Sequence, residues 1–122
     1  MERLIRAYFD AWLQKDGSRL GDLFEKDASY SECYGPEYFG LGQITEWFRD
    51  WNKRGKVLKW DIKQFIRQGD VCAVEWYFEC VYDGERSGFD GVSIIRFSGN
   101  GKISDVKEFE SKAEHIYPYG KP

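Results

Sequence analysis

The 122-residue chain lacks a long apolar run and a basic block, and its first residues do not predict a signal peptide. No apolar stretch approaches the ~20 residues of a membrane-spanning helix, and the charged start from Met1 to Phe9 differs from a signal peptide. Lysine and arginine are dispersed and the net charge is −3, whereas a nucleic-acid surface needs clustered positive charge. The sequence therefore predicts a cytoplasmic protein that binds neither membranes nor nucleic acid.

Histidine and cysteine are also scarce, with His115 alone and Cys33, Cys72 and Cys80. The last two cysteines lie roughly 26 Å apart if their segment is an extended strand, so they cannot bridge each other. Neither residue type has the spacing of metal ligands. No glycine-rich phosphate loop, nucleophile elbow or dinucleotide fingerprint is present. We therefore predict neither a metal nor a cofactor, and a reducing compartment.

Aromatic residues are abundant, at 18% of the chain, while methionine occurs once. The interior must therefore be built largely from rings. Flat rings suit a solid core and a ligand cavity equally well, so composition leaves both open. The length suits a single domain over residues 1–122 with one hydrophobic core.

Four consecutive antiparallel strands are predicted in the second half of the chain, over residues 57–67, 71–82, 89–97 and 102–110. The second of these alternates apolar and charged residues with a period of two, as a half-buried strand does. The third is apolar on both faces, so each of its sides must be covered. The inward face of the second strand consists of Cys72, Val74, Trp76, Phe78, Cys80 and Tyr82.

The first half of the chain is predicted to be mostly helical. Apolar residues recur at helical spacing over residues 2–15, and a second helix is predicted over residues 18–27. A strand over residues 28–34, a loop over residues 36–42 and a helix over residues 42–52 follow. The predicted fold is α+β, with helices packed into one face of a strongly bent sheet.

Three motifs and the order of elements resemble the nuclear transport factor 2-like superfamily. The motifs are FDAW at residues 9–12, DASYSECYG at residues 27–35 and FDGVSIIRFSGNGKI at residues 89–103. The superfamily includes ketosteroid isomerase, scytalone dehydratase, limonene-epoxide hydrolase and SnoaL-like polyketide cyclases. The resemblance implies a cone, in which a curved antiparallel sheet wraps around the long first helix, with two further helices and a pocket at the wide end.

Ketosteroid isomerase is the member whose catalytic positions can be matched. The resemblance implies that Tyr8 is the hydroxyl that donates to a developing enolate and that Glu32 is the catalytic base. The isomerase has a protonated aspartate where this chain has Ser93. Loss of one strong oxyanion donor costs ~2.7–4 kcal/mol of transition-state stabilisation, so efficient steroid isomerisation is not expected.

The final strand has two possible phases. If Val106 points inward, then Glu108 and Glu110 look into the same cavity as the predicted base, and at least one acid must be protonated, paired or hydrated. Alternatively, Ile103 and Phe109 point inward and both glutamates face solvent. Glu110 is of further interest because related hydrolases, cyclases and dehydratases use an acid in the final strand.

Each candidate also has a purely structural interpretation. Glu32 is either a base with a pKa raised by apolar walls or a rim glutamate held by hydrogen bonds. Tyr8 is either a pocket hydroxyl or a core tyrosine, and Ser93 makes room for a ligand. The predicted substrate-binding residues are Trp12, Tyr30, Trp47, Trp76, Phe78, Ser93 and Glu110.

Two functions remain open at this point. The first is a cofactor-free isomerase, cyclase or dehydratase that acts on a small hydrophobic carbonyl substrate through Glu32. The second is a binding or protein-interaction module without turnover. A homodimer is also predicted, because the outer face of the sheet carries apolar side chains that a monomer would seldom expose, namely Tyr77, Val81, Val92 and Ile94.

Overall fold

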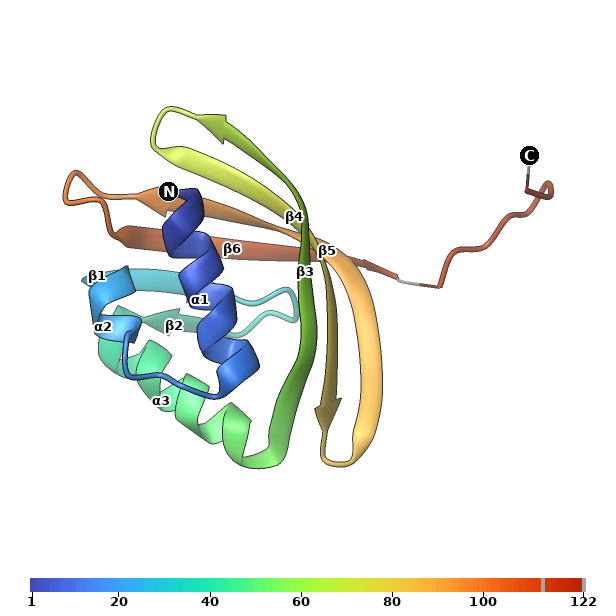
Figure 1. The fold of residues 1–122 in the computed structure, drawn as a ribbon, viewed down its shortest axis with the longest axis horizontal. Coiled ribbons are helices and arrows are strands. Elements are labelled where there is room, and N and C mark those ends of the chain that lie inside the picture. Colours follow the sequence, from blue (N-terminus) through green and yellow to red (C-terminus); the bar gives the residue numbers. More distant parts are fainter. Residues whose placement is uncertain (113, 122) are drawn as a thin grey trace.

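The computed structural model describes residues 1–112 and 114–121, and contains a six-stranded sheet curved around a helix (Figure 1). The elements are α1 (Glu2–Gln14), α2 (Leu20–Leu23), β1 (Phe24–Ser31), β2 (Glu37–Phe39), α3 (Gly40–Arg54), β3 (Gly55–Gln68), β4 (Val71–Tyr82), β5 (Glu85–Phe97) and β6 (Ile103–Lys112). The strand order is β2-β1-β6-β5-β4-β3. The α+β cone is confirmed.

The sheet differs from the predicted one in its first strands. The segment predicted to be a loop contains β2, and β1 pairs with β6 in parallel, so the sheet is mixed rather than wholly antiparallel. The second helix ends at Leu23 instead of Asp27. The prediction failed there because Leu20, Leu23 and Phe24 are all buried at helical spacing, although Phe24 already belongs to β1. Phe24 and Ala28 lie on the same face of β1, as residues four positions apart in a strand do.

Helix α1 occupies the hollow of the sheet because one of its faces is apolar and aromatic. Its side chains Ile5, Tyr8, Phe9 and Trp12 are buried. Phe9 stacks on Trp60 of β3 with ring centroids 3.7 Å apart and an angle of 5° between the planes. The helix ends where Lys15 adopts a left-handed conformation with φ of 54°. Aromatic packing therefore fixes the helix against the strands that form the cavity.

Irregular pairing and one glycine bend the sheet. The pairing of β3 with β4 shifts register twice, which increases local twist and curvature. Gly91 of β5 lies opposite Trp76 of β4. A Cβ atom at Gly91 would lie 2.4 Å from Cη2 of Trp76 and 2.6 Å from the carbonyl oxygen of Phe109. Only glycine therefore lets the indole of Trp76 lie across β5.

The two faces of the sheet have different characters. On the concave face Cys72, Val74 and Trp76 of β4 are buried. On the convex face Ile94 of β5 and Phe109 of β6 are 39% and 54% exposed. This convex face is the one through which the sequence predicts a homodimer. Within the described part of the chain, no helix combines the length and apolarity needed to cross a membrane.

Candidate functional site

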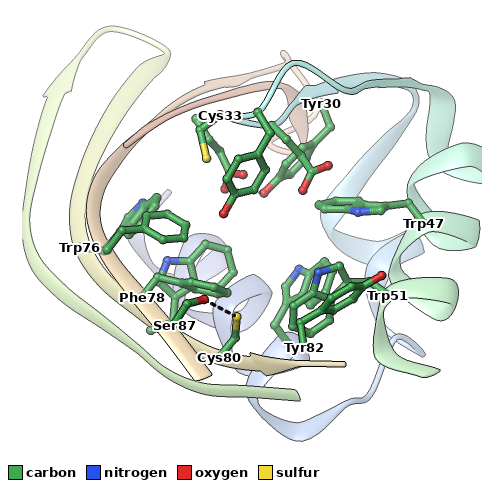
Figure 2. Close-up of a pocket in the computed structure, with 15 residues that line it drawn as sticks. Tyr30, Cys33, Trp47, Trp51, Trp76, Phe78, Cys80, Tyr82 and Ser87 are labelled. Atoms are coloured by element: carbon green, nitrogen blue, oxygen red, sulfur yellow. Dashed lines mark hydrogen bonds between the residues drawn. The ribbon is translucent and has the colours of Figure 1, made fainter. Parts of the chain in front are cut away.

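A cavity of about 420 Å³ lies between the concave face of the sheet and helices α1 and α3. All five tryptophans of the chain line it, and the rings do not fill it. Figure 2 shows Trp47, Trp51 and Tyr82 on one side of the cavity, with Trp76 and Phe78 on the other. The tryptophans are Trp12, Trp47, Trp51, Trp60 and Trp76. The alternative of a solid aromatic core is therefore excluded.

Glu32 lines the cavity at the point where β1 ends and the chain turns into β2. Its backbone N–H donates to the carbonyl oxygen of Pro36 at 2.9 Å, which closes the turn. The Tyr38 hydroxyl donates to Oε2 of Glu32 at 2.8 Å. The Tyr38 ring stacks on Trp47, with centroids 4.6 Å apart. The carboxylate is therefore held by a tyrosine that is itself fixed by packing.

Glu108 of β6 also lines the cavity, so the final strand adopts the phase in which Val106 is buried. The Tyr30 hydroxyl donates to Oε2 of Glu108 at 2.7 Å. The Ser93 hydroxyl donates to the same oxygen at 3.5 Å and accepts from Nε1 of Trp76 at 2.9 Å. Because both donors meet Oε2, the other carboxyl oxygen is the one available to carry a proton.

The pKa values of the two carboxyl groups are raised. Burial, together with the charge on Glu32, raises the pKa of Glu108 from 4.5 to about 8, although the hydrogen bonds from Tyr30 and Ser93 lower it. Burial also raises the pKa of Glu32, against the opposing effect of its hydrogen bond from Tyr38. Glu32 therefore ionises first, and its charge helps to keep Glu108 protonated at neutral pH.

The structure brings most of the predicted site residues together. The residues of the prediction that line the cavity are Trp12, Tyr30, Glu32, Trp47, Trp76 and Phe78. Ser93 is buried behind the lining and contacts two lining residues, Glu108 and Trp76. Glu110 is exposed near the end of β6 and is not part of the described lining. The roles of these residues toward a ligand remain predictions.

Tyr8 lies one layer behind the cavity wall. Its side chain is 1% exposed, and its hydroxyl has no hydrogen-bond partner among the described residues. The centroid of its ring is 5.9 Å from that of Tyr30, which does face the cavity. Burial and the charge on Glu108 raise the pKa of both tyrosines, so both remain neutral. Of these two tyrosines, Tyr30 is therefore the one whose hydroxyl contacts a cavity carboxyl, that of Glu108.

The sequence left one feature of this site open and missed another. The face of the final strand on which Glu108 lies was left undecided. Ile103 and Val106 are both buried, although they would lie on opposite faces of a regular strand. The pairing shifts by one residue at Ser104. The available signal was that Val106 and Glu108 are two residues apart, which places them on the same face of a strand. The contact between Tyr38 and Glu32 was missed because β2 was taken for a loop.

Other groups near the cavity are less suited to chemistry. Burial, with the charges on Glu110 and Glu108, raises the pKa of the Cys33 thiol to about 12, so Cys33 is not an activated nucleophile. Burial also raises the pKa of Cys80. Among residues 1–112 and 114–121, no three histidine, cysteine or acidic side chains converge as metal ligands do. The cavity carboxyls are therefore its reactive groups.

A model of the SnoaL-like domain matches residues 5–106 of the sequence. The chain belongs to the SnoaL-like domain family. This agrees with the resemblance to the nuclear transport factor 2-like superfamily. Among proteins with curated descriptions, none matches the chain.

Several solved structures share the SnoaL-like fold. One is a hypothetical protein with a ketosteroid isomerase-like fold from Catenulispora acidiphila, in complex with trimethylamine, at 20% identity and a TM-score of 0.75 over 90% of this chain and 85% of that one. An LEH-like epoxide hydrolase from M. tuberculosis has 15% identity and a TM-score of 0.80 over 89% and 76% of the two chains.

A third neighbour, provisionally named a polyketide cyclase, comes from Xanthomonas campestris. It shows 16% identity and a TM-score of 0.74 over 90% of this chain and 89% of that one. Identities this low show the shared fold and leave the chemistry to be argued from the cavity itself.

Proposed function

We propose that this SnoaL-like protein is a cofactor-free enzyme that moves a proton on a small hydrophobic carbonyl substrate. The observation that supports this proposal is the pair of carboxyl groups in one open aromatic cavity, with Glu32 ionising before Glu108. Two titratable groups that ionise in sequence within one site can serve as base and acid.

In this proposal Glu32 is the general base. Its carboxylate removes a proton from the carbon next to the substrate carbonyl, and the electron pair of the broken C–H bond moves toward the carbonyl oxygen. A base is most effective when its pKa lies near the working pH, and burial raises the pKa of Glu32 in that direction. The hydrogen bond from Tyr38 fixes the carboxylate.

Glu108 is the acid of the pair. Its protonated carboxyl donates a hydrogen bond to the oxygen on which negative charge develops. Ser93 occupies the position matched to the isomerase's protonated aspartate, and it is the cross-strand partner of Glu108. In this chain the neutral acid is therefore Glu108 of β6, and the matched position in β5 is Ser93. Return of the proton from Glu32 to another carbon restores the carbonyl and completes an isomerisation. If Glu32 first exchanges this proton with solvent, delivery of the solvent proton to the original carbon completes an exchange.

The test is deuterium exchange at the α-carbon of small aromatic and β,γ-unsaturated ketones in D₂O, followed by proton NMR. We expect the wild type to accelerate exchange above the buffer rate. Glu32→Gln should slow the catalysed exchange by roughly 10²–10⁴-fold, and Glu108→Gln by roughly 10²–10³-fold. Glu75→Gln is the matched control, because Glu75 lies on the opposite face of the same sheet, where it accepts from Gln64.

Two results would contradict the proposal. One is exchange at the buffer rate for every ketone, which would favour the alternative of a binding module without turnover. The other is catalysed exchange that persists in Glu32→Gln, which would remove Glu32 from the role of base.

A further inference from the structure

The cavity has acidic groups but no basic side chain to balance them. Among the described residues that line it, none is lysine, arginine or histidine. Arg54 pairs with Asp83 and lies over the Tyr82 ring, 5.5 Å from its centroid, and Lys63 pairs with Asp90. Within the described ranges, no basic group lies within ion-pair distance of Glu32 or Glu108. An ionised Glu32 is therefore uncompensated.

Aromatic rings stand at steep angles on one side of this cavity. The Trp12 ring packs against two of them. Its centroid lies 5.0 Å from that of Trp47 and 5.3 Å from that of Trp51, at interplanar angles of 58° and 83°. Trp51 in turn lies 5.3 Å from Tyr82. Figure 2 shows Trp47, Trp51 and Tyr82 together on that side. Ring faces carry negative electrostatic potential and attract cations, most strongly in tryptophan.

We propose that the natural ligand or substrate carries a tertiary or quaternary ammonium group, held between Trp47, Trp51 and Tyr82 and balanced by the Glu32 carboxylate. A neutral ligand would remove water from Glu32 without replacing it by any countercharge. A primary ammonium group or a guanidinium would need several hydrogen-bond acceptors, which walls made mostly of rings do not offer. An N-methylated ammonium needs only ring faces and one nearby negative charge.

This inference rests on the proposed function in one respect, namely that Glu32 is ionised while Glu108 is neutral. It also adds to that function. An ammonium substituent close to a carbonyl makes the adjacent C–H bond more acidic and keeps the neighbouring base deprotonated. The proposed substrate class is therefore a small aminoketone or acyl compound with an N-methylated ammonium group.

The test compares choline with 3,3-dimethylbutan-1-ol, which has the same shape but carbon in place of the charged nitrogen. Binding is measured by calorimetry at pH 7.5. We expect choline to bind at least about tenfold more tightly than the alcohol, as a cation–π contact with a partly desolvated cation implies. Glu32→Gln should remove most of this preference, and Trp47→Leu should reduce it. Glu75→Gln should leave it unchanged.

Equal or tighter binding of the alcohol by the wild type would overturn the inference. So would a preference for choline that survives in Glu32→Gln, which is nearly isosteric and tests the carboxylate even if Trp47→Leu fails to fold. Ketone exchange without any preference for choline would reject only this inference, whereas choline binding without exchange of any ketone would reject only the proposed function.

Discussion

Replacement of Glu108 by glutamine should change how the stability of this protein depends on pH. Glu108 has a pKa of about 8 in the folded state against an ordinary value of 4.5. Below pH 4.5 the group is protonated in both the folded and the unfolded state. As pH rises toward 8, the unfolded state loses the proton while the folded state keeps it, so the stability conferred by this group is progressively lost.

The size of the effect follows from the shift. Each pKa unit corresponds to about 1.4 kcal/mol, so a shift from 4.5 to about 8 removes on the order of 5 kcal/mol across that interval. Glutamine resembles the neutral acid, because its carbonyl oxygen can accept from Tyr30 and Ser93 as Oε2 of Glu108 does. The variant should therefore be close to the wild type in stability near pH 5 and more stable than it by several kcal/mol near pH 9.

The assay is urea unfolding of the wild type and Glu108→Gln at fixed protein concentration between pH 5 and 9, followed by circular dichroism. Glu75→Gln is the control, and its difference from the wild type should stay nearly constant. If the free-energy difference between Glu108→Gln and the wild type does not grow with pH, then Glu108 is ionised in the folded protein and the acid of the proposed pair is lost.

Three further substitutions test the surroundings of the cavity. Ser93→Ala removes the acceptor of the Trp76 indole N–H and a hydrogen-bond donor to Glu108. It should lower the free energy of unfolding by about 1–3 kcal/mol and raise the pKa of Glu108. An unchanged Glu108 pKa in a carboxyl titration would argue against this contact. Gly91→Ala should destabilise the fold by about 1–3 kcal/mol because the new methyl group would overlap Trp76, and wild-type stability in urea would contradict that packing. Ile94→Lys on the convex face should turn the predicted homodimer into a monomer in sedimentation velocity, and a wild type that already sediments as a monomer would refute the dimer.

The parts of the fold that followed from the sequence are those with regular periodicity. Strand β4 alternates without interruption, so its inward residues Trp76 and Phe78 could be assigned to one face before the structure was known. Helix α1 likewise shows its apolar stripe directly, and the predicted end at Lys15 agrees with its left-handed cap. Where local pattern and tertiary packing agree, the sequence is sufficient.

The parts that could not be predicted depend on irregular pairing between distant segments. The extra residue Ser104 in β6 reverses the phase of that strand, and no local pattern reveals such a bulge. The parallel pairing of β1 with β6 joins two segments that are far apart in the sequence. Glu108 lies where these irregularities meet, next to Tyr30 of β1. The acid of the candidate site was therefore harder to find than its base, Glu32.

The central claim is that one carboxyl group of this cavity is neutral and the other ionised at neutral pH. It is tested most directly by a ¹³C NMR titration of the protein labelled at the glutamate side-chain carboxyl carbons, with Glu32→Gln and Glu108→Gln used to assign the two resonances. We expect a resonance absent from Glu108→Gln to titrate with a midpoint about 8, after the resonance absent from Glu32→Gln has already titrated. If both resonances titrate at or below the ordinary value of 4.5, the cavity holds two ionised carboxylates and the account is wrong.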